Sequence, residues 1–179
     1  MYIINLYGAP GSGKSTGAAY VFSRLKMAGV NAELVTEFAK DKVWEENKAV
    51  FENQIYIFAK QFFRISRLDG KVDVVVTDSP LLLGAFYGRN DARLGKEFVS
   101  LVRNVSRSYD SMDIFLQRVK PYSPVGRFQT EEESDELSGE LFDFLDKNGV
   151  KPIFCPGNTK GFDDIVNVTL DLLGVSRAS

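Results

Sequence analysis

The sequence predicts an α/β fold: a five-stranded parallel sheet with helices between successive strands. Short apolar runs alternate along the 179 residues with longer amphipathic stretches, which is the pattern of strand–helix–strand units. The run at 72–77 is nearly continuous in apolar residues, as is typical of a central parallel strand buried on both faces. A chain of this length is expected to form one domain, residues 1–179.

Each element of the first half has its own signal. The apolar run at 2–7 predicts a strand, and a glycine-rich turn follows it. Residues 15–28 carry apolar side chains at helical spacing, and Gly29 is suited to end that helix. A second strand is expected at 32–36.

The longest amphipathic stretch predicts a helix over 49–68 that ends before Gly70. Its apolar positions recur at intervals of four and three residues, as one face of a helix requires. They are Phe51, Ile55, Phe58, Phe62 and Ile65. The strand at 72–77 follows this helix.

In the second half, a loop at 120–129 marked by proline and glycine precedes a helix start. Thr130 and Glu133 form a capping box, in which the hydroxyl caps the helix and the glutamate reaches back. The elements expected in this half are helices at 81–87, 95–109, 130–147 and 163–173, and strands at 113–119 and 152–155.

The composition excludes whole classes of chemistry. Histidine is absent and Cys155 is the only cysteine, so no Ser-His-Asp or Cys-His catalytic group and no Cys/His zinc site can form. A disulfide within the chain is excluded as well, which favours a reducing compartment. The net charge of -2 opposes a domain built to grip nucleic acid, although it is compatible with a local basic groove. No apolar run approaches about 18 residues, so we expect a cytoplasmic protein without a membrane partner.

The strongest motif is Gly8-Ala9-Pro10-Gly11-Ser12-Gly13-Lys14-Ser15, which matches G-x-x-x-x-G-K-[ST] in full, between a predicted strand and a predicted helix. Glycines let backbone N–H groups approach phosphate oxygens, and the following helix points its positive end at the same anion. The lysine can reach the β- and γ-phosphates, and the final serine can ligate Mg²⁺. The residues expected to bind ATP are Gly8, Gly11, Ser12, Gly13, Lys14, Ser15 and Thr16.

A second signal is the acidic residue Asp78, which comes directly after the predicted strand at 72–77. A Walker B carboxylate holds Mg²⁺ from this position, directly or through water, and ligands of open parallel sheets bind at this end of the strands. Asp78 also precedes Ser79-Pro80, where an aspartate commonly forms a turn. Because the phosphate loop is present, the metal role is favoured, and Ser15 would share it.

Three segments together resemble a known family: Gly8–Thr16, Val35–Lys40, and Thr77–Pro80 with the downstream Arg118…Arg127 loop. In these segments the chain is similar to the small P-loop kinases of the nucleoside and nucleotide kinase group. The likeness is greatest to the ribosylnicotinamide-kinase-like ATPases and related short proteins often encoded by phages. The resemblance implies a P-loop NTPase three-layer sandwich, a substrate cleft over the strand ends and a mobile lid that contributes arginines.

In such kinases, a carboxylate after the second strand faces the acceptor hydroxyl. The resemblance assigns that place to Glu37, which would accept the hydroxyl proton or orient the hydroxyl. Asp41, one helical turn later, is a second candidate, and a carboxylate at Glu37 also suits a helix N-terminus. Ser79 departs from the family pattern, because many deoxynucleoside and thymidylate kinases have an arginine directly after the acid of the third strand.

The segment 118–130 is expected to be the lid. It carries Arg118, Lys120 and Arg127 and no acid. Phosphoryl transfer needs positive charge beside the transferred group and exclusion of water, so Arg118 and Arg127 are the candidate catalytic cations. The acid-rich residues 131–136 offer the alternative that these cations form surface pairs and serve solubility alone.

Few residues mark the acceptor side. Arg89 and Arg93 either bind an acceptor phosphate, which would make the substrate a nucleotide, or form a surface pair. Asn158 follows the last predicted strand, where the family brackets the adenine. Further candidates near the base or over the cleft are Trp44, Gln54, Tyr56 and Gln61.

The leading interpretation is an ATP-dependent kinase that acts on a hydroxyl or phosphate of a nucleoside- or nucleotide-like acceptor. A second is a regulatory P-loop ATPase without a small-molecule acceptor; a GTPase is disfavoured because the N-K-x-D motif of guanine recognition is missing. In a third interpretation, the protein is a kinase whose acceptor is a hydroxymethylated base in DNA. The net charge disfavours DNA as a partner, although a basic strip of Arg89, Arg93, Arg103 and Arg107 would suit it.

Overall fold

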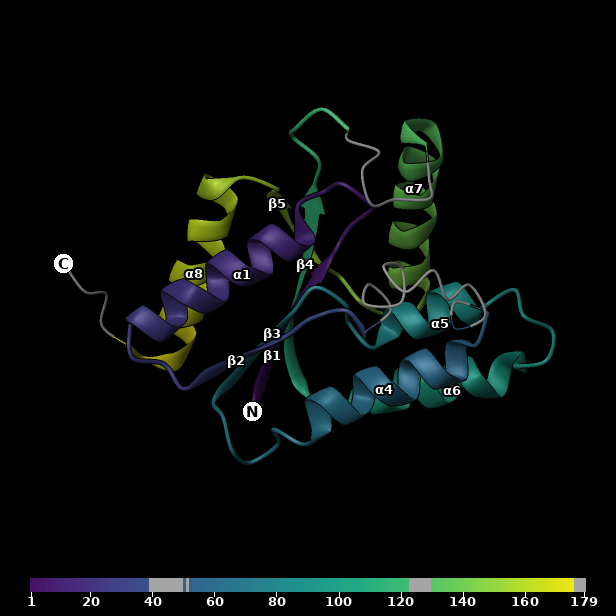
Figure 1. Cartoon of the computed structure of the whole chain (residues 1–179), viewed down its shortest axis with the longest axis horizontal. Coiled ribbons are helices and arrows are strands. Elements are labelled where there is room, and N and C mark those ends of the chain that lie inside the picture. The colour runs from purple at the N-terminus through teal and green to yellow at the C-terminus, as the bar shows by residue number, and fades with distance from the viewer. Residues whose placement is uncertain (39–49, 51, 123–129, 176–179) are drawn as a thin grey trace.

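The computed structural model describes residues 1–38, 50, 52–122 and 130–175. Five strands form one sheet in the order β2-β3-β1-β4-β5, and every neighbouring pair is parallel. The predicted five-stranded parallel sheet is therefore confirmed, with β1 at its centre (Figure 1). The strands are β1 (Tyr2–Tyr7), β2 (Ala32–Val35), β3 (Val74–Thr77), β4 (Asp110–Gln117) and β5 (Ile153–Pro156).

Helices cover both faces of the sheet and complete a three-layer sandwich (Figure 1). Two helices pack on one face, α1 (Lys14–Met27) and α8 (Thr159–Leu173). The other face carries α4 (Gln54–Ser66), α5 (Leu82–Gly88), α6 (Gly95–Ser106) and α7 (Glu131–Lys147). Side chains of β1 alternate between the two cores: Leu6 belongs to the first, and Ile3 and Tyr7 belong to the second.

Two predicted boundaries are wrong, one because of strand pairing and one because of a local helix cap. β4 spans Asp110–Gln117 instead of 113–119, because its pairing with β1 continues until Tyr2 lies opposite Asp110. α8 begins at Thr159 instead of 163, because the side chain of Asn158 accepts a hydrogen bond from the Gly161 N–H (3.1 Å) and caps the helix earlier.

The aromatic face of α4 is only partly confirmed. Phe58 and Ile65 are buried, whereas Ile55 is 53% exposed. The first turn of α4 contains no buried residue, so burial against the sheet begins only at Phe58, and the predicted place of Ile55 in the core is wrong. The predicted start at 49 is wrong as well, because α4 begins at Gln54 after its N-cap Asn53, and Phe51 lies outside the described residues.

The parallel sheet brings the predicted site residues to one edge. The phosphate loop follows β1, Glu37 follows β2, Asp78 follows β3, Arg118 follows β4 and Asn158 follows β5. Since all five strands point the same way, the residues that follow them meet at the carboxyl edge of the sheet. No helix among the described residues has the length and apolar character needed to cross a bilayer.

Candidate functional site

The phosphate loop connects β1 to α1 through three glycines with left-handed backbone conformations. The φ angles of Gly8, Gly11 and Gly13 are 140°, 87° and 96°, values that residues with a side chain rarely adopt. A Cβ atom on Gly8 would lie 2.5 Å from Ser12 Oγ and 2.8 Å from the Leu116 carbonyl oxygen. The first position of the loop therefore has room only for glycine.

Helix α1 starts directly on this loop. Its N-cap residue is Gly13, no side chain caps it, and its first turn holds no acidic residue. The hydroxyl-bearing residues Ser15 and Thr16 are exposed in the same turn. Backbone N–H groups at such a helix start, together with the positive end of the helix dipole, bind phosphate. Loop and helix together fit the phosphate tail of a nucleotide.

Lys14 folds back over the loop that precedes it. Its Nζ donates hydrogen bonds to the carbonyl oxygens of Gly8 (2.7 Å) and Ala9 (3.1 Å). These neutral acceptors hold the ammonium group at the mouth of the loop. A phosphate would offer the same ammonium a charged acceptor, and hydrogen bonds between charged groups are the stronger ones.

The turn between β5 and α8 packs closely against the phosphate loop. The Gly157 N–H donates to the Gln117 carbonyl oxygen (2.8 Å), and a Cβ atom on Gly157 would lie only 2.1 Å from the Ser12 carbonyl oxygen. Asn158, the next residue, uses its side-chain oxygen to cap α8. The sequence carries a signal for this support, since a Pro-Gly pair follows the last predicted strand, but the pattern does not say what the glycine touches.

The acids after β2 and β3 come together. Asp78 is 5% exposed, and its Oδ1 accepts a hydrogen bond from the Glu37 N–H (2.9 Å). β3 lies between β2 and β1, so both acids lie on the same side of the phosphate loop. Asp78 also fixes the start of the segment that carries Glu37. Asp41 lies outside the described residues.

The Gln61 side chain links the segment after β2 to the end of β3 by hydrogen bonds. It is 3% exposed, its Oε1 accepts from the Phe38 N–H (3.2 Å), and its Nε2 donates to Thr77 Oγ1 (3.4 Å). The prediction that its amide reads a nucleobase is not supported by these contacts. Gln54 and Tyr56 begin α4, and Trp44 lies outside the described residues.

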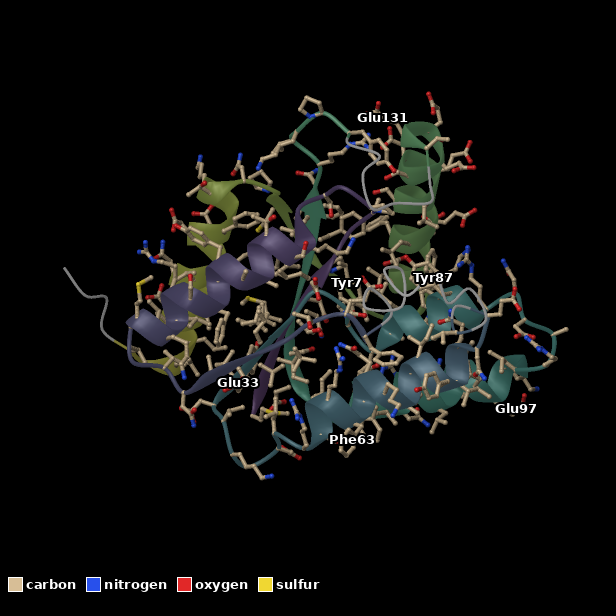
Figure 2. The ribbon with its side chains drawn as sticks, viewed as in Figure 1. Tyr7, Glu33, Phe63, Tyr87, Glu97 and Glu131 are labelled. Atoms are coloured by element: carbon tan, nitrogen blue, oxygen red, sulfur yellow. The ribbon has the colours of Figure 1, made fainter. Side chains whose placement is uncertain are left out.

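Tyr87 on α5 is a residue that the sequence does not single out (Figure 2). Burial of its hydroxyl, and secondarily the negative charge of Glu37, raise the pKa of Tyr87 to about 12. A phenol with this pKa stays protonated near neutral pH and is a hydrogen-bond donor. The Tyr87 residue as a whole is 47% exposed on α5.

A divalent ion would find oxygen ligands on two of these elements. Among the described residues, no three His, Cys, Asp or Glu side chains form a metal-binding group. Mg²⁺ is usually held by one or two carboxylates together with substrate phosphates. Ser15 and Asp78 suit an ion that arrives with a nucleotide.

Comparison with known proteins agrees with this geometry. A family model described as an AAA domain matches residues 3–160. The chain belongs to this family. No curated protein matches its sequence.

The fold of this AAA domain is similar to a solved structure described as deoxyadenosine kinase from M. mycoides with the products dCMP and a flexible dCDP bound. The TM-score is 0.57, and the match covers 95% of this chain and 99% of the other. The sequences are 17% identical, so the likeness is one of fold. It agrees with the predicted P-loop kinase architecture.

Arg118 of this AAA domain is bound to the first turn of α7. Its Nη2 lies 2.6 Å from Asp135 Oδ1 and 3.2 Å from Glu131 Oε1, and Figure 2 shows Glu131 at the start of that helix. Its Nη1 is buried and has no hydrogen-bond partner among the residues that the structure describes. The sequence leaves two interpretations open for Arg118, a catalytic cation or a member of surface ion pairs, and these contacts correspond to the second. Arg127, the second predicted cation, lies outside the described residues.

The two arginines considered for an acceptor phosphate are both paired locally. Arg89 bonds to Glu140 and lies 3.9 Å above the Phe86 ring. Arg93 pairs with Asp91 at 2.7 Å, and this guanidinium lowers the pKa of Asp91 to about 2. In the described structure they do not converge on the phosphate loop as a phosphate clamp.

Proposed function

We propose that this AAA domain is an ATP-dependent phosphotransferase whose acceptor is a hydroxyl group of a nucleoside-like molecule. The observation that carries the proposal is the hydrogen bond from the Glu37 backbone N–H to the Asp78 carboxylate (2.9 Å), which brings the segments that carry these two acids together beside a complete phosphate loop. A loop of this kind holds the donor, and a neighbouring carboxylate is what a hydroxyl acceptor needs. The similarity in fold to a deoxyadenosine kinase supports the nucleoside-like acceptor.

The donor side follows from the loop. Backbone N–H groups of the glycine-rich loop would hold the β-phosphate, and Lys14 would leave its carbonyl partners for the β- and γ-phosphates. Ser15 and Asp78 would hold Mg²⁺, which supplies neutralisation of the phosphate charge. Arg118 and Arg127 remain the proposed cations beside the transferred group, and Asn158 the proposed neighbour of the adenine.

The transfer itself needs one proton acceptor. The acceptor oxygen forms a bond to the γ-phosphorus while the bond from that phosphorus to the bridging oxygen breaks, and ADP leaves with the electron pair. The acceptor proton passes to the Glu37 carboxylate.

The ion pairs of Arg89 and Arg93 favour a hydroxyl acceptor over a phosphate acceptor. Arg89 and Arg93 are paired with Glu140 and Asp91, so binding an acceptor phosphate would require breaking these contacts. Near the phosphate loop, the segments after β2 and β3 carry the acids Glu37 and Asp78, which suit a neutral hydroxyl better than a dianion.

The test is transfer of label from γ-labelled ATP, with Mg²⁺, to separate pools of nucleosides, nucleoside monophosphates, nicotinamide riboside and hydroxymethylated DNA. We expect label in a nucleoside-type pool. Lys14→Ala should abolish transfer, and Glu37→Gln should lower it by at least about 100-fold. Circular dichroism of both variants controls for folding.

The other outcomes separate the alternatives. Label in DNA would identify a base-modifying kinase, and label in the monophosphate pool would show that the acceptor is a phosphate. Release of free phosphate with no labelled pool would favour a regulatory ATPase. Turnover of Lys14→Ala within tenfold of wild type would overturn the assignment of the phosphate loop itself.

A further inference from the structure

The hydroxyl of Ser134, in the first turn of α7, reaches across to the phosphate loop. Ser134 is fully buried, and its Oγ donates a hydrogen bond to the carbonyl oxygen of Pro10 (2.8 Å), a residue 124 positions away in the sequence. Helical serines and threonines commonly bond to the carbonyl one turn back. Ser106 and Thr169 of this chain do so, at 2.8 Å and 2.7 Å, whereas Ser134 bonds to the loop.

The bond to Pro10 controls the direction of the next backbone donor. A trans peptide is planar, and its C=O and N–H point in opposite directions; the described residues contain no cis peptide. Holding the Pro10 carbonyl toward α7 therefore turns the Gly11 N–H away from α7. Gly11 has a φ of 87° and no side chain that would resist a flip of this peptide. The Ser134 hydroxyl supplies that resistance.

Packing alone does not hold this end of α7. The first turn of α7 carries no apolar side chain, and it borders a pocket of about 350 Å³ lined among others by Ser134, Ser138, Phe142 and Phe154. The buried apolar residues of the helix, Leu141 and Leu145, lie further along. Polar contacts therefore position the first turn, namely the Ser134 bond and the ion pairs of Arg118.

We propose that Ser134 is a positioning residue that aims the Gly11 amide at the nucleotide phosphates and links the first turn of α7 to occupancy of the phosphate loop. This inference rests on the proposed function only insofar as the loop binds a nucleotide. The link works in both directions, because a ligand that favours one orientation of the loop must also favour the matching position of the helix.

The test compares Ser134→Ala with Ser138→Ala, a matched control one turn along the same helix and on the wall of the same cavity. Calorimetry with ADP should show about fivefold weaker binding for Ser134→Ala, the usual effect of one lost hydrogen bond, and unchanged binding for Ser138→Ala. In amide NMR spectra, ADP should shift the Gly11 resonance in wild type and control, and much less in Ser134→Ala. Urea unfolding curves of the two variants control for folding.

A second readout reports the link to α7. Hydrogen exchange of amides in the first turn of α7 should slow on ADP binding in the wild type, and this slowing should be lost in Ser134→Ala. If Ser134→Ala binds ADP as the wild type does and keeps the Gly11 shift, the positioning role is wrong while the proposed function stands. If the wild type does not bind ADP, both are overturned.

Discussion

At the scale of single residues, Asp78 combines an observed structural contact with a proposed metal role, and the two duties are separable. Asp78 accepts a hydrogen bond from the Glu37 backbone, and we assign the same carboxylate to Mg²⁺. The first duty needs only an acceptor oxygen, whereas the second needs negative charge. An asparagine keeps the oxygen and removes the charge, so a single substitution can separate the two.

Asp78→Asn is expected to lower the rate of phosphoryl transfer by at least about 100-fold, because the side-chain oxygen stays while the metal loses a charged ligand. The rate should be measured against the concentration of Mg²⁺, and a larger excess of the ion should recover part of it. Asp78→Ala removes both duties and should in addition lower the free energy of unfolding. A rate for Asp78→Asn within tenfold of wild type would leave Asp78 with its structural duty alone.

At the scale of elements, the site depends on contacts that the sequence motif does not contain. The turn after β5 packs its Gly157 against the Ser12 carbonyl, and α7 holds Pro10 through Ser134. These segments lie far from the loop in the sequence. The capping box of Thr130 and Glu133 can be predicted from four consecutive residues and is confirmed, whereas the partner of Ser134 cannot, because it depends on how α7 packs.

Gly157→Ala is expected to abolish nucleotide binding, although Gly157 is no part of the phosphate-binding motif. The new Cβ would lie 2.1 Å from the backbone oxygen of Ser12, so the loop itself must move. Gly139→Ala on α7 is the matched control, because a Cβ atom there meets nothing within 4 Å and alanine favours the helix. Calorimetry with ADP checks both; normal binding by Gly157→Ala would mean that the loop tolerates displacement.

At the scale of the whole molecule, a polar cluster lies inside the layer between the sheet and its helices. Asn5 on β1 donates a hydrogen bond to Asp113 on β4 (2.8 Å), and the buried Tyr7 also bonds to this carboxylate. Burial raises the pKa of Asp113, while the hydrogen bonds from Asn5, Ser111 and Tyr7 partly oppose the rise. The folded protein therefore binds the proton of the Asp113 carboxyl group more tightly than the unfolded chain does.

The stabilising effect of that proton is complete below the ordinary pKa of an aspartate and is lost as the pH rises through the raised value. Asp113→Asn removes the titration and keeps a neutral partner for Asn5 and Tyr7. As the pH rises from the ordinary pKa of an aspartate through the raised pKa of Asp113, the free energy of unfolding should fall more steeply in the wild type than in the variant. Urea unfolding at several pH values measures this, with the exposed Asp110→Asn as the control; equal slopes for wild type and Asp113→Asn would contradict it.

The sequence by itself determined the layers of this protein and the place of its phosphate loop. Strand and helix periodicity and a contiguous eight-residue motif are local signals that later packing does not change. Only the tertiary structure decided which groups surround that loop: the contact of Asp78 with the Glu37 backbone, the hydrogen bonds of Gln61 and the bond of Ser134 to Pro10. Each of these contacts joins residues from different segments of the chain. Such contacts depend on the order of the strands in the sheet and on the packing of the helices over it, and no local sequence pattern encodes either.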